Sequence, residues 1–523
     1  MNYTSQLIRG SIACILSLVA FCFTGFQAWP TVAQVVATQG SNLEEAQEFL
    51  GNYGTLYTMT ITPAAEPIPA FKYRLVVPPH KTTAGNAVTH YLRSLALDSL
   101  NRSWEDAWKE YGRETVDAWQ QLSTPSNEIP IDDLQKVSSS FDFYVDNYIR
   151  RATRCRYADW TLALEDMSGL EMYSLLLPGV QQSREIAEIL SLRNRLAIIE
   201  GRHEDSIEHI KMIYKLGESV NENGFIVANL AAAREVRMAN ECMIDLIASP
   251  NSPNMYWALA ELPRPILSFR KAMRLESNLS ERFFPELNDV ETAEYSVEQW
   301  KQLLLTTTDT VTAVRAIIGT SETANPKLQM QDELLAMAAG LVAYPSAKQR
   351  LLDAGLGEER VKAMSVSQTL LVDFKRDCDY FANEFEKTLH VPYQDSLDFA
   401  DRAEGLLYPV SMSRFGAIMA TMVLQPNQSI RRVGYHIQVE IDSLMVIEAI
   451  RNHATTKGEF PKSLDDLDLP VRQNLLTGKP FGYRIKDGNA VLDVQANSRS
   501  KRFVISIANQ NSAAEQQAEQ GSD

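Results

Sequence analysis

Apolar side chains recur once per α-helical turn over most of residues 85–425, and this periodicity constrains the fold more than any other feature of the chain. Between residues 184 and 222, one apolar face ends at Gly201 and a second begins at Ile207. The 523 residues include only 24 Gly and 22 Pro, which agrees with long helices and short connections. We therefore predict a mainly α protein, an irregular array of antiparallel helices with a small C-terminal α+β unit.

The segment 184–222 is expected to form two amphipathic helices joined at Gly201. The stretch from Gly201 to Ile210 resembles the turn and second helix of a tetratricopeptide repeat. Such repeats recur about every 34 residues, and the helical domain 85–425 offers one reasonable copy. We therefore expect a partly tetratricopeptide-like array rather than a regular solenoid. Further helices are predicted at 226–248, 254–262, 296–318, 329–342, 346–355 and 366–389.

Residues 1–37 have the form of an export signal. Arg9 is the only charged residue among the first 40, and an uncharged run with an apolar centre at Ile12–Phe23 follows it. The small residues Ala33 and Ala37 offer cleavage sites. If the segment is not cleaved, its uncharged run of 20 residues would serve as an N-terminal membrane anchor. In either case we expect an exported protein of the periplasm or of the extracytoplasmic face of the membrane.

Residues 38–84 are expected to form a linker and an extended strap. Residues 57–62 alternate polar and apolar side chains, and residues 71–77 form a second extended run. Because four prolines flank these runs, we expect a pair of short strands or a strap and not a central strand.

The C-terminal part changes character. A long amphipathic helix is predicted at about 428–456, and Gly458 suits its C-cap. Two apolar runs then flank Asp487-Gly488, a strong hairpin signal, and residues 502–507 offer a third strand. The polar residues 508–523 are predicted to be disordered.

Residues 458–467 and 476–484 of this unit resemble the globular tail of type II secretion pseudopilins. Those proteins carry Gly-x-Tyr-Pro-x-x-Leu and Asp-Pro-x-Gly-x-Pro-Tyr-x-Tyr stretches before a hairpin. Here Phe460 replaces the first Tyr, and Asn474-Leu475-Leu476 stands where the Asp-Pro would be. The resemblance implies a pseudopilin-tail-like α+β unit over 426–507. Through residues 69–78, residues 254–263 and this tail, the whole chain resembles a family of large exported bacterial helical proteins with no assigned activity. That resemblance implies export and this architecture, and it implies no catalytic residue.

The net charge bears on possible partners, and the cysteine content bears on disulfide bonds. The chain has 50 Lys and Arg against 66 Asp and Glu, a net charge of −16, which disfavours nucleic-acid binding. Cys155, Cys242 and Cys378 are the cysteines beyond the N-terminal segment. Their odd number and wide spacing favour buried thiols, while one bridge between any two of them stays open.

No motif assembles a reactive centre, so no catalytic, cofactor-binding or metal-ligating residue is predicted. The histidines His203 and His209 are six residues apart and do not share a helix face, so we expect solvated side chains and not zinc ligands. The acids Asp159, Glu165, Asp166 and Glu171 around Trp160 would suit a glycosidase, but we favour a solvated acidic helix end packed on Trp160. The same surface explanation applies to Asp142 with Asp146 and to Asp373 with Asp377. A polar turn or a calcium site is open for Asp465, Asp466 and Asp468.

One arginine and one pair of tryptophans could have either a structural or a ligand-binding role. Arg193 falls on an apolar helix face, where it would pair with an acid or bind an anion. Trp104 and Trp108 are one turn apart and are expected to pack together in the core.

Three functions remain open for an exported helical protein of this kind. The favoured hypothesis is a cell-envelope scaffold or binding protein whose partner is a protein or an envelope polymer. An envelope hydrolase acting on glycan or peptide through unrecognised carboxylates is the first alternative, and a secretion-system accessory is the second. Membrane contact is expected only through residues 1–37 if they are retained. A hydrolase should bring carboxylates together in one deep pocket, whereas a binding protein should offer a shallow groove lined by aromatics and Arg.

Overall fold

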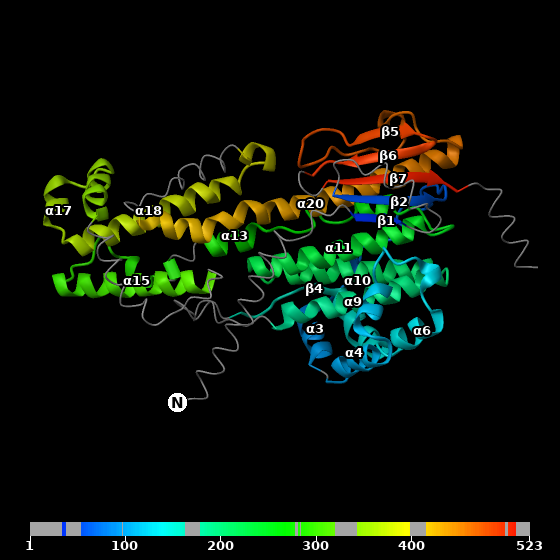
Figure 1. Cartoon of the computed structure of the whole chain (residues 1–523), viewed down its shortest axis with the longest axis horizontal. Coiled ribbons are helices and arrows are strands. Elements are labelled where there is room, and N and C mark those ends of the chain that lie inside the picture. The colour runs from blue at the N-terminus through cyan, green and yellow to red at the C-terminus, as the bar shows by residue number, and fades with distance from the viewer. Residues whose placement is uncertain are drawn as a thin grey trace, which may run out of the picture.

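The computed structural model describes residues 34–37, 54–96, 98–162, 178–277, 281–282, 284–318, 342–397, 415–496 and 500–508. Within this part the protein is mainly α-helical with one five-stranded sheet and one two-stranded pair, so the predicted fold class is confirmed. Figure 1 shows an elongated molecule in which the longest helix, α20 (Phe415–Lys457), runs from a small helical lobe to a larger lobe that carries the sheet. The predicted leader up to residue 33, the helix at 329–342 and the tail from residue 509 lie outside the described residues.

The larger lobe begins with short helices and continues with three long ones. The short helices are α3 (Ala87–Leu95), α4 (Asp98–Tyr111), α5 (Arg113–Trp119), α6 (Ile131–Ser139), α7 (Asp142–Tyr144) and α8 (Arg150–Arg154), with a π-helical turn, η3 (Val145–Ile149), before α8. The long helices are α9 (Pro178–Ile199), α10 (His203–Asn221) and α11 (Ile226–Ala248), followed by α12 (Tyr256–Ala260) and α13 (Arg270–Ser277).

Helices α9 and α10 form the predicted helix pair, and α11, also predicted, packs against both. Gly201 takes φ +70° in the turn between α9 and α10, a backbone conformation that suits glycine. Gly217 lets α10 and α11 approach closely, because an added Cβ would lie 2.7 Å from a methyl group of Val236. The small residues of α11, among them Ala228 and Ala232, are fully buried at this contact.

The smaller lobe has a separate apolar core. Its helices are α15 (Val297–Ile318), a helix over 342–353, α17 (Glu358–Ala363) and α18 (Val366–Thr388). Phe284, Trp300, Leu371 and Phe374 form the centre of this core. Short 3-10 turns complete the described helices: η1 (Pro79–Lys81), η2 (Ser126–Glu128), η6 (Pro285–Leu287) and η7 (Leu464–Asp466).

The five-stranded sheet joins the two ends of the chain. Its order is β1 (Gln34–Ala37), β2 (Thr55–Ile61), β7 (Lys501–Ile507), β6 (Asn489–Val494) and β5 (Gly482–Lys486). The predicted hairpin is β5–β6, and the third apolar run is β7. Strands β3 (Thr83–Asn86) and β4 (Cys155–Tyr157) form a separate parallel pair.

The expectation that residues 57–62 would not form a central strand is wrong. Strand β2 lies between β1 and β7 and pairs in parallel with both. The prolines do not interfere because the strand ends at Ile61, before Pro63. Ring stacking of Tyr57 on Phe503, with centroids 4.9 Å apart, fixes the pairing of β2 with β7. The second run, residues 71–77, joins no sheet and is not extended as predicted: it contains a turn, in which the Lys72 amide donates to the Pro69 carbonyl oxygen at 2.9 Å, and bends, and we keep the name strap for this segment.

A buried ion pair holds the start of this strap, defined from here on as residues 62–82. Arg451 and Glu448 of α20 have no exposed side-chain surface, and Arg451 Nη1 lies 3.0 Å from a Glu448 carboxylate oxygen. Arg451 also donates to the carbonyl oxygen of Thr62, at 3.0 Å, and to that of Ser252, at 2.9 Å. The Asn254 side-chain amide donates to the backbone carbonyl oxygens of Ala64 and Glu448. We call these five side chains and backbone groups, from Thr62, Ser252, Asn254, Glu448 and Arg451, the Arg451 network.

Removing the arginine of this network is expected to cost much of the protein's stability. Arg451→Met would leave Glu448 charged, buried and without its cation, so we expect a loss of about 3–5 kcal/mol in the free energy of unfolding. Glu448→Met combined with Arg451→Met should recover part of that loss. Urea unfolding followed by circular dichroism measures both variants. Lys362→Met, which breaks an exposed pair with Glu358, is the control and should change stability by less than about 1 kcal/mol. A similarly small change for Arg451→Met would contradict the assignment.

A second buried carboxyl, Glu235 of α11, faces Ser183 of α9. The Ser183 hydroxyl oxygen lies 2.6 Å from the Val180 carbonyl oxygen and 2.5 Å from Glu235 Oε1. A serine hydroxyl has one hydrogen to donate, which Ser183 shares between the Val180 carbonyl oxygen and Glu235 Oε1. Burial raises the pKa of Glu235 to about 8, although Ser183 and Arg234 oppose this.

Glu235 should therefore make stability depend on pH. Its carboxyl keeps a proton in the folded protein up to about pH 8 and loses it near pH 4.5 when unfolded. The unfolded state then binds fewer protons across this window, so stability should fall as pH rises, by up to about 1.4 kcal/mol per pH unit. Glu235→Gln should remove this contribution, whereas Glu359→Gln, at a fully exposed position, should not. Denaturation midpoints measured between pH 5 and 8 that run parallel for Glu235→Gln and the unchanged protein would contradict the prediction.

Candidate functional site

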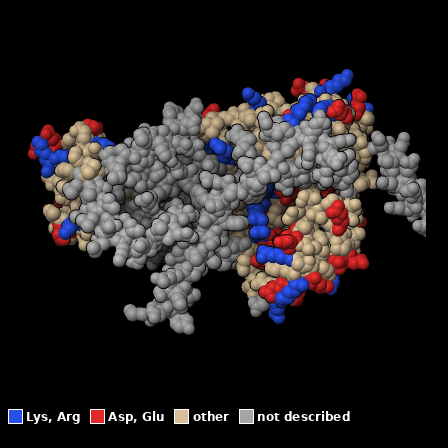
Figure 2. Space-filling view, in the orientation of Figure 1, with Lys and Arg blue, Asp and Glu red and all other residues tan. Residues whose placement is uncertain are grey.

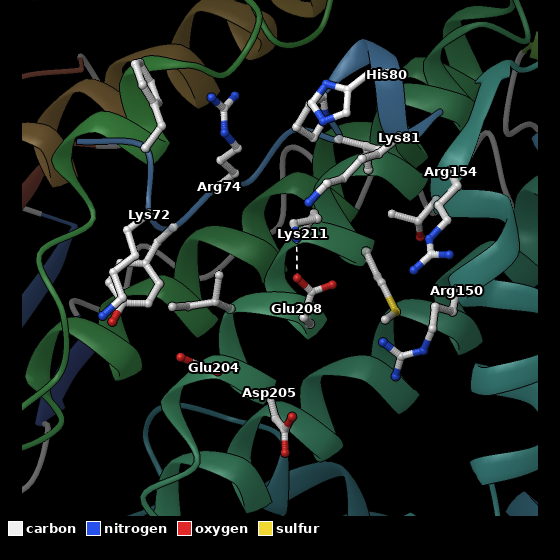
Figure 3. A pocket seen from close by; sticks show the side chains of 17 residues that line it. Lys72, Arg74, His80, Lys81, Arg150, Arg154, Glu204, Asp205, Glu208 and Lys211 are labelled. Carbon is white, nitrogen blue, oxygen red and sulfur yellow. Dashed lines mark hydrogen bonds and ion pairs between the residues drawn. The ribbon is translucent and has the colours of Figure 1, made fainter. Parts of the chain in front are cut away.

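A groove of about 970 Å³ lies between the strap and helices α8 and α10. One wall comes from residues 71–81 of the strap, and the other comes from the side chains of α8 and the first half of α10 (Figure 3). The groove therefore forms where the predicted strap meets the predicted tetratricopeptide-like turn, two features more than 100 residues apart in sequence.

The strap wall is held at three places along its length. At its start, the Arg451 network binds Thr62 and Ala64. In the middle, Leu75 is buried in the main core and Arg74 forms an ion pair with Glu261. Burial raises the pKa of the Glu261 carboxyl, and Arg74 opposes that rise.

The end of the strap is joined to the end of α8 by the parallel pair β3–β4. Thr83 of β3 is the register partner of Cys155 of β4. Lys81 precedes Thr83 by two residues, and Arg154 immediately precedes Cys155, so this short ladder brings the two cations to one side of the groove. Asn86 strengthens the junction by exchanging hydrogen bonds with the backbone of Asp159, at 2.6 and 2.9 Å.

Helices α8 and α10 supply the opposite wall and the floor. Arg150 and Arg154 are four residues apart on α8 and share a face. On α10, Glu204, Glu208 and Lys211 follow one face at helical spacing. The apolar side chains that line the groove are Phe71, Val77, Ile207 and Met212.

The groove is cationic in a protein with a net charge of −16. Its lining has six Lys or Arg and three Asp or Glu, a local excess of three positive charges when His80 is neutral. The basic residues are Lys72, Arg74, Lys81, Arg150, Arg154 and Lys211, and the acidic ones are Glu204, Asp205 and Glu208. Figure 3 shows Lys81, Arg154 and Arg150 on one side of the groove, away from Glu204 and Asp205.

Three of the six cations already have carboxylate partners. Arg74 pairs with Glu261, Arg150 with Asp146, and Lys211 with Glu208. Among the described residues, Lys72, Lys81 and Arg154 have no carboxylate within ion-pair distance, and the Lys72 ammonium lies 5.0 Å from the Tyr73 ring centre. The groove thus offers cationic groups that remain available to a ligand.

Surface charge elsewhere is mixed. In the view of Figure 2, Lys and Arg lie next to Asp and Glu around α15 and α17 and over the larger lobe. Many of these form exposed pairs within one helix, such as Lys362 with Glu358 and Lys109 with Glu105, which contribute little to stability.

Several residues singled out from the sequence have structural roles outside the groove. Arg193 pairs with Asp142, which confirms the reading of a paired arginine. Trp104 and Trp108 stack with ring centroids 5.7 Å apart, and Trp104 is buried as expected. The three cysteines Cys155, Cys242 and Cys378 are free and buried.

Some expectations about acids and histidines are wrong. His209 is buried rather than solvated, and burial lowers its pKa to about 3. His203 bonds to the Ser249 hydroxyl at 3.0 Å. Asp373 and Asp377 are buried rather than on the surface, and Asp373 accepts two hydrogen bonds from Arg350. Helix periodicity did place them on one face, but the partner helix that covers this face comes from elsewhere in the sequence.

The remaining acidic candidates do not assemble a site in the part of the chain that the structure describes. Asp465 and Asp466 lie in the turn η7, where Asp466 accepts from the Ser463 backbone as a polar cap. Glu165, Asp166 and Glu171 lie outside the described residues, and Trp160 donates to the Ser219 carbonyl oxygen. A search of the described residues finds no group of three or more potential metal ligands.

The comparisons with known protein families, curated proteins and solved structures find no match for this chain. Among the described helices, none is long and apolar enough to cross a membrane.

The Arg74–Glu261 pair should restrain the strap wall of the groove. Arg74→Met would remove this contact while leaving Leu75 in the core, so we expect faster amide hydrogen exchange over residues 71–78 and little change in α15 or α18. Hydrogen exchange read by mass spectrometry measures this, with Arg113→Met, at an exposed pair with Asp117, as the control. Unchanged exchange in the strap would show that Arg74 does not hold it.

Proposed function

We propose that the protein is an exported cell-envelope binding protein that holds its ligand in the groove between the strap and helices α8 and α10. The observation that carries this proposal is the groove itself, a space of about 970 Å³ lined by charged, aromatic and apolar side chains. Its size suits a substantial ligand, since small-molecule sites measure roughly 300–1,000 Å³. Phe71, Tyr73, Arg74, Arg150 and Arg154 provide the aromatic and Arg lining expected of a binding groove.

The positions of the carboxyl groups whose pKa is raised by burial favour a binding function over hydrolysis. Burial raises the pKa of Glu235, Glu241, Asp245 and Glu448, and none of these four lines the groove. Three of them have clear partners in helix packing: Ser183 for Glu235, Arg195 for Asp245 and Arg451 for Glu448. A hydrolase of the alternative kind would need such carboxyls facing a substrate.

Export rests on the sequence of residues 1–37, and β1 sharpens the expected cleavage site. Residues 34–37 pair with β2 as the outer strand of the sheet. Cleavage after Ala37 would remove this strand, whereas cleavage after Ala33 would preserve it. We therefore favour Ala33 if the segment is cleaved.

Expression of the tagged full chain in a bacterial host tests export and processing together. The protein should fractionate with the periplasm, and Edman sequencing of a processed product should begin at Gln34. Retention of the intact chain on the outer face of the inner membrane would instead support the anchor alternative. A cytoplasmic product that keeps residues 1–37 would contradict export.

Site-specific photocrosslinking tests the groove as the binding site. A photoreactive phenylalanine analogue replacing Tyr73, which lines the groove, should yield one discrete adduct in the envelope. The same replacement at Tyr295, an exposed tyrosine of the smaller lobe, is the matched control and should yield none. Equal adducts at both positions, or none at position 73, would contradict the proposal, and turnover of a cell-wall extract by the purified protein would favour the hydrolase.

A further inference from the structure

We infer that the groove binds an extended ligand that carries two or more oxyanion groups, phosphate or carboxylate. This inference rests on the proposed function and names the chemistry of its ligand. The central observation is that Lys81 and Arg154, whose backbone positions adjoin the β3–β4 ladder, both line the groove while lacking an acidic partner among the described residues.

The placement of these two cations is costly without a ligand. Like charges brought to one side of a groove repel each other, and a bound anion removes that repulsion. Arg150, one helical turn before Arg154, lines the groove as well, although it is already paired with Asp146. Arg presents a planar fork of donors that matches the oxygens of phosphate or carboxylate, and Lys adds a point charge.

The acids of the groove do not cancel this charge. Lys211 pairs with Glu208, and Asp205 pairs with Arg202, which lies outside the groove lining. Among the described residues, Glu204 is then the one acid of the lining without an ion-pair partner, against three such cations, Lys72, Lys81 and Arg154. Figure 3 places Glu204 and Lys81 on different sides of the groove, so an anion beside Lys81 and Arg154 need not approach Glu204.

The distribution of the cations indicates an extended ligand rather than a single small ion. Lys72 and Lys81 line the strap wall nine residues apart, and Figure 3 shows Lys72 at one end of the groove and Lys81 with Arg154 toward the other. The apolar residues Val77, Ile207 and Met212 line the groove as well. A chain with repeated oxyanions could therefore contact separate cations while its backbone packs on these apolar groups.

Isothermal titration calorimetry on the full chain tests the inference with two probes, inorganic tripolyphosphate for phosphate and trigalacturonate for carboxylate. At least one should bind, and its affinity should fall as salt screens the cations. Lys81→Gln combined with Arg154→Gln should weaken binding about tenfold or more, because each loses a charge-assisted contact. The charge-preserving exchange Lys81→Arg with Arg154→Lys should retain most of the affinity.

The control removes the same two charges elsewhere. Lys301→Gln combined with Arg113→Gln changes exposed residues outside the groove and should leave affinity within about twofold. Equal weakening in this control and in the groove variant would show general surface attraction and overturn the inference. If neither probe binds while the Tyr73 adduct still forms, the oxyanion assignment fails and the proposed function stands. If the adduct is absent as well, both fail.

Discussion

The buried pair between Arg451 and Glu448 is the interaction on which the arrangement of distant segments depends. One guanidinium joins helix α20 to the end of β2 and to the loop between α11 and α12. Taking two charges out of water is unfavourable unless each finds partners, and here the Arg451 network provides them from three parts of the chain. The pair therefore selects one way of docking these segments, because any other would leave a buried charge without a partner.

This docking also builds the groove. The Arg451 network fixes the start of the strap, Leu75 and Arg74 hold its middle, and the β3–β4 ladder fixes its end beside α8. Each restraint lies outside the ligand space or at its edge, which leaves Lys72, Lys81 and Arg154 available. The protein keeps a net charge of −16 and concentrates an excess of positive charge in a small part of its surface.

Helix positions could be predicted because they depend on local periodicity. The pair α9–α10, the turn at Gly201 and the β5–β6 hairpin all follow from patterns within short windows. The central position of β2 could not be predicted, because its partner β7 lies more than 440 residues away. The burial of Asp373 and His209 was not predicted for another reason: their partners Arg350 and Arg193 lie only 23 and 16 residues away, but a polar residue on a helix carries no periodic signal of which side chain will pair with it.

The groove could not be predicted for the same reason as the position of β2, although the sequence predicts a segment in each of its two walls. The strap and the turn at Gly201 were recognised separately, but no local signal marks a parallel ladder of four and three residues such as β3–β4. Without that ladder, Lys81 and Arg154 are ordinary surface cations. Their juxtaposition is a property of tertiary structure alone.

The most direct test of this account is the affinity of Arg451→Met for whichever probe, tripolyphosphate or trigalacturonate, binds the unchanged protein, measured at a temperature where circular dichroism shows the variant to be folded. Arg451 does not line the groove, yet the account predicts weaker binding, because the start of the strap loses its anchor. An affinity equal to that of the unchanged protein would contradict the claim that the Arg451 network positions the groove.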